Sequence, residues 1–162
     1  MMTASIRPFQ VADQAAVRAL VEEGLGEHFG HIDRDANPDL VDIAATYARP
    51  PHAFFVAELD GTLVGTTGLL VEGHTGRLVR VAVARDRRRS GIATLLLNHV
   101  AEFARGARLS RLVAHTQPEW PDAMRFYRSH GFVPYGCDTV DVYLHRPVVV
   151  TSAQRPVAEL GL

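Results

Sequence analysis

The sequence Arg88-Arg89-Ser90-Gly91-Ile92-Ala93 joins two segments whose apolar residues follow different periods. The preceding run, Leu78 to Ala84, is rich in β-branched residues as in a strand, and the following run, Ile92 to Arg105, has helical spacing. A helix start leaves its first backbone amides unpaired and carries partial positive charge, which suits an anion. Gly91 and Ala93 have side chains small enough for a ligand to approach the backbone. We therefore predict a phosphate-binding turn between a strand and a helix.

The order Arg-x-x-Gly-x-Ala at Arg88, Gly91 and Ala93 resembles the acetyl-CoA motif of the GNAT superfamily of N-acetyltransferases. In that family the amides of this turn hold the CoA pyrophosphate, and the preceding strand pairs with the pantetheine arm. The resemblance thus implies acetyl-CoA as the acyl donor. The cofactor-binding residues that it implies are Val81, Ala82, Val83, Arg88, Arg89, Ser90, Gly91, Ile92, Ala93 and Thr94. The residues alone leave open that Gly91 simply begins a helix.

A second motif lies between Pro121 and Phe132, where the ending Ala-x-x-Phe-Tyr-x-x-x-Gly-Phe resembles the last helix and following strand of the same family. By motif position, Tyr127 is implied to be the general acid that protonates the departing thiolate. The other interpretation is that Tyr127 packs half-buried with its hydroxyl on a neighbour. Trp120 stands where the family often has an asparagine that contacts the cofactor. It is therefore a candidate for the wall of the acceptor site, or for ordinary packing.

The remaining pattern predicts the element order β-α-α-β-β-β-α-β-α-β-β. This is the order of the GNAT fold, an α/β (α+β) fold with a mixed, mainly antiparallel central sheet. Asp60-Gly61 is a predicted hairpin turn, and a second hairpin turn lies around Gly73 to Gly76. Asp13 is predicted to cap the first helix, and Gly24 to Asn37 is predicted to be a loop. The predicted strands span residues 5–11, 53–58, 62–71, 77–84, 111–115, 131–135 and 140–145, and later helices begin at Pro38, Ile92 and Pro121.

The composition is typical of one globular domain, since 47% of the 162 residues are hydrophobic and 22% are charged. We assign this domain to residues 1–146, and residues 147–162 to a C-terminal tail without an assigned role. The sequence has neither an apolar run long enough to span a membrane nor a signal-peptide pattern, so a cytoplasmic location is expected. The single cysteine, Cys137, and the spacing of the histidines predict no disulfide and no metal site.

The net charge of −1 gives no general attraction to nucleic acid or membranes, so a small-molecule partner is expected. A local cluster of Arg85, Arg87, Arg88 and Arg89 lies beside the predicted phosphate turn, where it suits the phosphates of CoA. The cluster lacks the interleaved aromatic residues of a nucleic-acid surface. Nucleic-acid binding through it is kept as an alternative. A homodimer is expected because many members of the family form one.

Acetyl transfer to an amine requires a neutral amine, a stabilised oxyanion and a protonated leaving sulfur. The resemblance implies direct attack in a ternary complex, with the backbone amide of Val81 or a neighbour polarising the thioester carbonyl. Many family members have a glutamate on the central strand, but residues 77–84 contain no carboxylate. Glu72, at the end of the preceding strand, is the candidate general base acting through water, and His74 is the second candidate. Both residues fit a solvated turn equally well.

Arg80 is a candidate acceptor-binding residue. It precedes Val81, so strand alternation places its side chain on the face opposite Val81 and Val83. There it could hold an acceptor carboxylate, and it fits a surface cation equally well. The wall of the acceptor pocket is further assigned to His28, together with His31, Asp33 and Asp35, although loop clusters of this kind are usually solvated.

We therefore predict an acyltransferase that uses acetyl-CoA to acetylate a primary amine of a small molecule, with amino-acid-like compounds among the candidates. One alternative is a protein acetyltransferase that acts on a lysine or an N-terminus. Another is a non-catalytic acyl-CoA-binding regulatory module, which the missing strand carboxylate favours and Tyr127 argues against.

Overall fold

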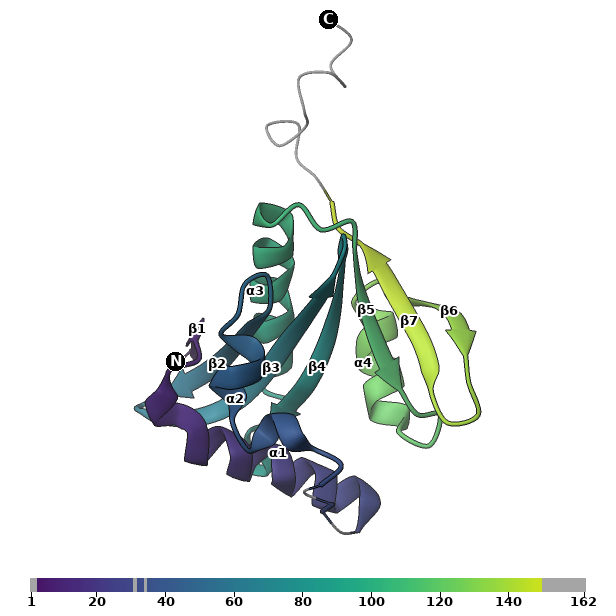
Figure 1. Ribbon diagram of the computed structural model, residues 1–162. Coiled ribbons are helices and arrows are strands. Elements are labelled where there is room, and N and C mark those ends of the chain that lie inside the picture. Colours follow the sequence, from purple (N-terminus) through teal and green to yellow (C-terminus); the bar gives the residue numbers. More distant parts are fainter. Residues whose placement is uncertain (1–2, 31, 34, 150–162) are drawn as a thin grey trace, which may run out of the picture. The chain divides into compact units, whose positions relative to one another are not determined.

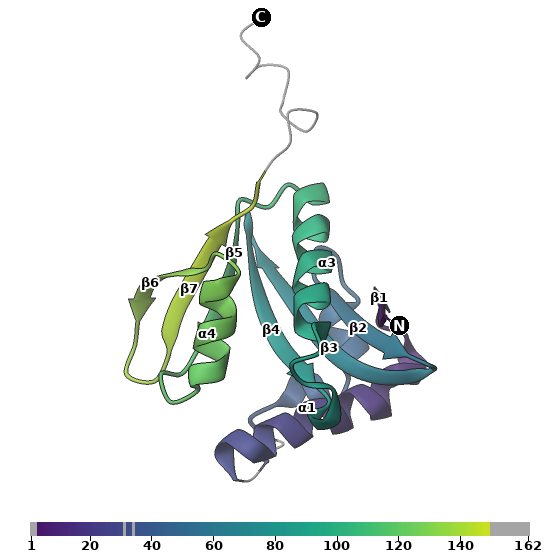
Figure 2. The same ribbon diagram turned by 180° about the vertical axis from the view of Figure 1, so that it is seen from behind.

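The computed structural model describes residues 3–30, 32–33 and 35–149. The chain forms two compact units, one made of Met1–Val71 and Arg77–Val100 and the other of Glu72–Gly76 and Ala101–Leu162. Over the described residues, seven strands and four α-helices follow one another in the predicted order, which confirms the expected mixed α/β fold (Figures 1 and 2). Residues 150–162 of the predicted tail lie outside the described residues.

The first unit contains strands β1 (Ser5–Pro8) and β2 (Ala53–Leu59), β3 (Thr62–Glu72) except its last residue, and β4 (Thr75–Val83) from Arg77 onward, in that order across the sheet. β1 pairs antiparallel with β2, and β2 pairs antiparallel with β3. Asp60 and Gly61 join β2 to β3 with φ values of 52° and 75°, as a tight hairpin turn requires. The hairpin turn predicted at Asp60-Gly61 is therefore confirmed.

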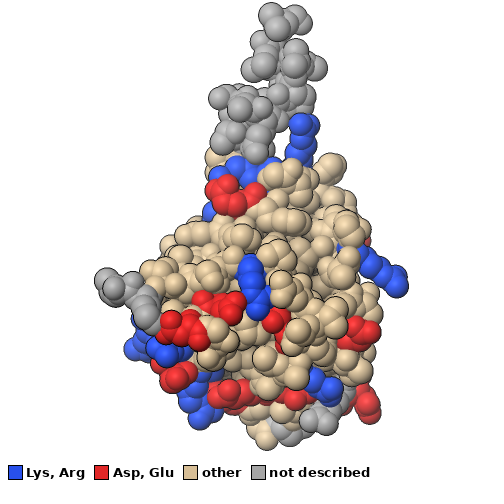
Figure 3. All heavy atoms as spheres, turned by 90° about the vertical axis from the view of Figure 1, so that its left-hand side faces the viewer, with Lys and Arg blue, Asp and Glu red and all other residues tan. Residues whose placement is uncertain are grey.

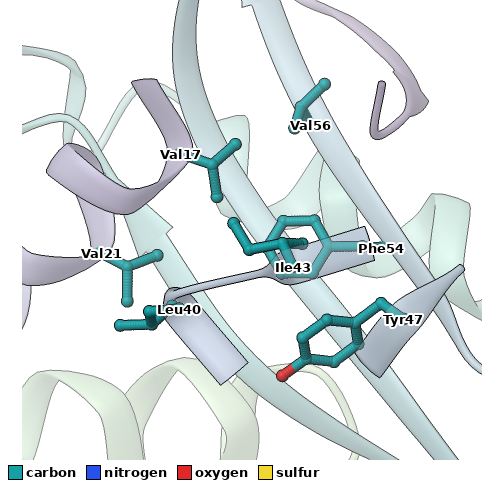
Figure 4. Packing of buried hydrophobic residues seen from close by; sticks show 7 residues of the cluster. All are labelled: Val17, Val21, Leu40, Ile43, Tyr47, Phe54 and Val56. Atoms are coloured by element: carbon teal, nitrogen blue, oxygen red, sulfur yellow. The ribbon is translucent and has the colours of Figure 1, made fainter. Parts of the chain in front are cut away.

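Helices cover both faces of these strands (Figures 1 and 2). α1 (Gln14–Phe29) and α2 (Ile43–Tyr47) lie on one face, and the first turns of α3 (Ile92–Gly106) lie on the other. The core under α1 and α2 consists of seven residues that are at most 4% exposed (Figure 4): Val17, Val21, Leu40, Ile43, Tyr47, Phe54 and Val56. On the other face, Gly65 of β3 lets Ile92 and Leu96 of α3 approach the sheet backbone closely.

The first helix is longer than predicted. Gly24 and Gly26 lie inside α1, and the helix ends at Gly30, whose φ of 74° is left-handed. A Cβ atom at Gly24 would have no neighbour within 4 Å, so packing does not require glycine at this position. Glycine lowers the stability of the helix there only through its low helix propensity. The prediction that residues 24–37 form a loop is therefore wrong at its start, and His28 belongs to the last turn of a helix.

The second predicted helix is divided in two. A short 3-10 helix, η2 (Pro38–Leu40), precedes α2, because Asp42 between them is extended with φ −145° and ψ 91°. The Asp42 side chain accepts a hydrogen bond from the Ala45 amide at 3.1 Å and so caps α2. The first strand is also shorter than predicted, since the chain leaves β1 after Pro8 and forms a 3-10 helix, η1 (Val11–Asp13).

The second unit contains β5 (Arg111–Thr116), α4 (Pro121–Ser129), β6 (Val133–Cys137) and β7 (Val142–Pro147). The strands lie in the order β5-β7-β6, and both pairs are antiparallel. β6 and β7 each begin and end two residues later than the strands predicted at 131–135 and 140–145. The most buried side chains in this unit include two at alternate positions of β5, one on β7, one on α3 and one just before β6: Leu112, Ala114, Leu144, Ala104 and Phe132.

The surface is mixed in charge. On the face shown in Figure 3, acidic and basic side chains are interspersed over a largely uncharged surface. Among the described residues, no helix has both the length and the apolar character needed to cross a membrane.

Candidate active site

The predicted phosphate-binding turn follows β4 in the first unit. A 3-10 helix, η3 (Arg85–Arg87), leads into Arg88, which is extended with φ −65° and ψ 152°. Arg89 and Gly91 then adopt left-handed φ values of 60° and 86°, and the Leu95 amide donates to the Gly91 carbonyl at 3.0 Å to begin the hydrogen bonds of α3. By helix geometry, the amides of Ile92 and the residue after it precede that first bond, so they face the turn.

The turn is open and exposed. Residues 85–91 are all exposed, and a Cβ atom at Gly91 would meet nothing within 4 Å. The open space beside Gly91, together with its left-handed backbone, fits an anion bound by backbone amides at a helix start. Farther into α3, Ile92 is buried against β3, and Ala93 and Thr94 are half-buried.

Two arginines of the turn share one carboxylate, for which the sequence predicts no role. Glu27, near the end of α1, accepts hydrogen bonds from Arg88 at 2.7 and 3.0 Å and from Arg85 at 2.9 Å. The hydrogen bonds from Arg88 and then from Arg85 lower the pKa of Glu27 to about 2. Arg85 is 66% exposed and Arg88 42% exposed, so these pairs contribute little to stability. They do reduce the positive charge available beside the turn.

The end of β4 departs from regular strand geometry at Arg80. Its φ of 54° is left-handed, which is uncommon for a residue with a side chain. Val79 and Ala82 both pack against the core under α1 and α2, although regular alternation would place them on opposite faces. The left-handed residue at position 80 therefore changes which face of the sheet the following side chains of β4 occupy. Val81 is 36% exposed, and Val83 is half-buried.

Arg80 has a partner within the protein. Its Nε and Nη2 atoms donate to the two carboxylate oxygens of Asp39, in η2, at 2.9 and 2.6 Å. The Tyr47 hydroxyl donates to the same carboxylate at 2.7 Å. Burial tends to raise the pKa of Asp39, but the hydrogen bonds from Arg80 and Tyr47 outweigh it and leave that pKa lowered. The Nε–Nη2 edge of the Arg80 guanidinium, one of the edges that can bind a carboxylate through two hydrogen bonds, is therefore already engaged.

Tyr127 lies in α4 of the second unit and is only 8% exposed. Its ring makes edge contacts with Phe126 and Phe132, with ring centres 5.4 and 5.3 Å apart. Its backbone carbonyl accepts from the Phe132 amide at 3.0 Å, where α4 ends and the chain turns toward β6. Burial raises the pKa of the Tyr127 hydroxyl to about 12, so this group is protonated at neutral pH.

The candidate bases lie in the turn before β4. Glu72 ends β3, and His74 follows in the exposed turn, where its carbonyl accepts from the Ser110 amide at 2.6 Å. Both residues precede the first residue of β4, whereas Val81 is near the last. The length of β4 thus separates Glu72 and His74 from Val81 along the chain.

The expected acceptor residues fall in different elements. His28 is exposed in α1, and His31 lies outside the described residues. Asp33 accepts hydrogen bonds from the amides of Asp35 and Ala36, so its carboxylate holds a local turn. Trp120 is half-buried in the second unit at the start of α4, where its carbonyl accepts from the Met124 amide at 3.2 Å.

Comparison with known proteins identifies the family. The model of the acetyltransferase (GNAT) family matches residues 15–132, which include both sequence motifs. The chain belongs to this family and is an acyltransferase.

Individual relatives are similar to this chain over most of its length. The chain is 32% identical over 143 residues to an IAA acetyltransferase of Azospirillum brasilense, covering 83% of this chain and 92% of that protein. It is 34% identical over 120 residues to N-acetylaspartate synthetase of Rattus norvegicus, covering 72% of this chain but only 40% of that protein.

Solved structures share the fold. A GNAT acetyltransferase of Staphylococcus aureus Mu50 superposes with a TM-score of 0.83 at 20% identity, over 91% of this chain and all of that one. The PaiA N-acetyltransferase of Thermoplasma acidophilum, solved with coenzyme A, gives a TM-score of 0.79 at 14% identity, over 90% of this chain and 99% of that one.

Proposed function

We propose that this protein transfers the acetyl group of acetyl-CoA to a primary amine of a small molecule by direct attack in a ternary complex. The observation that carries the proposal is the exposed turn at residues 88–91, with left-handed residues at Arg89 and Gly91, immediately before a long helix. Backbone amides at such a turn bind phosphate groups without needing a cationic side chain. Bound acetyl-CoA would supply an activated acetyl thioester.

Within this proposal, the residues from Arg88 to Thr94 hold the pyrophosphate, and residues 81–83 pair with the pantetheine arm. The Val81 amide donates to the acetyl oxygen, where negative charge develops. The amine nitrogen adds to the thioester carbonyl carbon to give a tetrahedral oxyanion, and the C–S bond breaks as the carbonyl re-forms. Tyr127 gives its phenolic proton to the departing sulfur, a role that requires the protonated hydroxyl described above.

The amine proton must leave through a base. Glu72 remains the proposed acceptor of this proton, acting through water, with His74 as the second candidate. Both side chains are exposed, so water reaches them. Replacing Glu72 by Gln should lower turnover if Glu72 is the base, and should leave it unchanged if His74 serves instead.

The acceptor is proposed to be an amino-acid-like amine. The name of the rat relative, N-acetylaspartate synthetase, supports an amino acid as the acceptor class, and the shared region covers 72% of this chain. His28 and Trp120 are the proposed contacts to the acceptor. A homodimer and a cytoplasmic location are part of the same proposal.

Calorimetric titration with acetyl-CoA tests the proposal directly. We expect saturable binding that is lost in Gly91→Glu, because the new carboxylate would fill and charge the turn. Gly61→Glu is the matched control, since Gly61 is also left-handed, also without neighbours within 4 Å, and lies in the β2–β3 hairpin. Equal affinity in all three proteins would remove the turn from the cofactor site. Absence of binding by the unmodified protein would reject the proposed function.

A positive titration would be followed by an acceptor screen. Useful probes are L-aspartate, spermidine and a short peptide with a free N-terminal alanine, each assayed by release of free CoA thiol. Acetylation of the amino acid alone supports the proposed class. Acetylation of the peptide alone would favour the alternative of a protein acetyltransferase.

A further inference from the structure

We propose that Asp39, Thr66 and Arg80 form a positioning group that fixes the peptide bond between Arg80 and Val81. The inference deepens the acetyl transfer proposed above and rests on it, because that reaction uses the Val81 amide as the hydrogen-bond donor to the acetyl oxygen. All three residues belong to the first unit, and none of them contacts a reacting atom in this proposal.

The carbonyl of that peptide bond is held by a buried side chain. The Thr66 hydroxyl, on the neighbouring strand β3, donates to the Arg80 carbonyl oxygen at 2.8 Å. Thr66 is fully buried, so water does not compete for this hydrogen bond. In a planar trans peptide, the C=O and the following N–H point in opposite directions. With the Arg80 carbonyl held toward Thr66, the Val81 N–H therefore points away from β3.

The backbone conformation of Arg80 also sets the direction of the Val81 N–H. A left-handed φ of 54° disfavours any residue with a Cβ atom, and such a conformation persists only where the surroundings impose it. Relaxation of Arg80 to ordinary strand geometry would rotate the adjoining peptide plane. The direction of the Val81 N–H would change with it, which matters because oxyanion stabilisation depends on donors fixed in advance.

The side chain of Arg80 is held in a way that imposes this conformation. The Arg80 guanidinium donates two hydrogen bonds of 2.9 and 2.6 Å to the Asp39 carboxylate, and the Tyr47 hydroxyl donates a further hydrogen bond to the same carboxylate. Asp39 is itself fixed, since its neighbour Leu40 is only 2% exposed within the core. An acceptor carboxylate would have to displace Asp39 to reach the same nitrogens. We therefore assign Arg80 to positioning in place of the acceptor contact expected from sequence.

The test separates the backbone conformation from the side chain. Arg80→Ala removes the guanidinium and still disfavours a left-handed φ, whereas Arg80→Gly removes it and accepts that φ freely. We expect kcat to fall roughly tenfold in Arg80→Ala and in Asp39→Asn, with KM for acetyl-CoA within about twofold of the unmodified value. Arg80→Gly should recover most of the lost kcat, and adding Asp39→Asn to Arg80→Gly should cause no further loss. Equal losses in the alanine and glycine variants would overturn the proposal.

A control ion pair addresses stability. Arg7 and Asp13 form a similar two-point pair in the same unit, at 2.7 and 2.9 Å, but away from β4. Asp13→Asn should lower thermal stability without changing kcat. A kcat loss in Asp13→Asn equal to that in Asp39→Asn would show a general effect of weakened packing and would overturn the assignment.

A spectroscopic measurement keeps the inference separate from the proposed function. The backbone φ of residue 80 and the amide resonance of Val81 can be followed by NMR without any acceptor or acetyl-CoA. We expect both to change in Asp39→Asn and in Thr66→Val, and to stay near the unmodified values in Arg80→Gly. Unchanged values in Asp39→Asn would overturn the positioning role even in an active enzyme. Failure of acetyl-CoA to bind would instead reject the proposed function.

Discussion

The carboxylate of Glu27 accepts two hydrogen bonds from the Arg88 guanidinium, 61 positions further along the chain. The pair connects the last turns of α1 to the first residue of the phosphate-binding motif. It also means that the motif arginine already has an anionic partner, with which the phosphates of a bound nucleotide would compete.

This competition predicts tighter cofactor binding in Glu27→Gln. Removing one negative charge at hydrogen-bond distance from two exposed guanidinium groups should lower the Kd for acetyl-CoA roughly fivefold at low salt. The gain should shrink as salt is added, because exposed charges are screened. Calorimetry at two salt concentrations checks both statements. Glu22→Gln, in the same helix but paired with Arg18, should leave the Kd unchanged. Weaker binding in Glu27→Gln would mean that Glu27 holds Arg88 in its binding position.

Tyr127→Phe is predicted to separate chemistry from binding. Loss of the phenolic proton should lower kcat about 100-fold, as for removal of a general acid. Acetyl-CoA affinity should stay within about twofold, since the ring and its contacts with Phe126 and Phe132 are retained. Tyr135→Phe removes a hydroxyl from a tyrosine that is 43% exposed and serves as the control. A rate equal to that of the control would leave Tyr127 with a packing role only.

Stability is predicted to decrease in acid through Asp39. Its folded-state pKa lies below its ordinary value of 3.8, since the hydrogen bonds from Arg80 and Tyr47 outweigh the opposing effect of burial. A carboxyl group of this kind contributes stability that is present above its unfolded pKa and is lost as pH falls through its folded pKa. Denaturant unfolding between pH 5 and about pH 2 should therefore show a shallower loss in Asp39→Asn than in the unmodified protein. Parallel curves for the two proteins would contradict this assignment.

Two glycines are predicted to respond oppositely to alanine. At Gly65, a Cβ atom would lie 2.8 Å from Ile92 Cγ2 and 3.0 Å from Leu96 Cδ1, so Gly65→Ala should destabilise the protein by about 1–3 kcal/mol. At Gly24, within α1, it would meet nothing within 4 Å, so Gly24→Ala should stabilise by about 1 kcal/mol. Denaturant unfolding of both variants measures the difference. Stability gained at Gly65 would show that α3 can move away from β3.

The sequence predicts those parts of the structure that depend on neighbouring residues. The Asp60-Gly61 turn and the helix that carries Tyr127 each have a local signal, and both are found as expected. The end of α1 was missed because glycine usually signals a break, while here Gly24 and Gly26 continue the helix.

The partners of the site arginines could not be predicted because they are remote in the chain. Asp39 and Arg80 are 41 positions apart, and nothing near either residue signals the other. The left-handed φ of Arg80 could not be predicted either, since this conformation is usually indicated by a glycine and not by an arginine. The contacts of Glu27 with Arg85 and Arg88 could not be predicted either, because residues 24–37 are predicted to be a loop.

The short 3-10 helix Pro38–Leu40 carries a core residue and a polar anchor side by side. Leu40 fills the core, and Asp39, one position earlier, holds Arg80. Under the positioning role proposed for Asp39, a substitution that shifts Leu40 would alter turnover before it unfolds the protein. A mutational screen scored on activity alone would then identify Leu40, although it is a core residue. Selection for catalysis would also preserve the packing beneath α1.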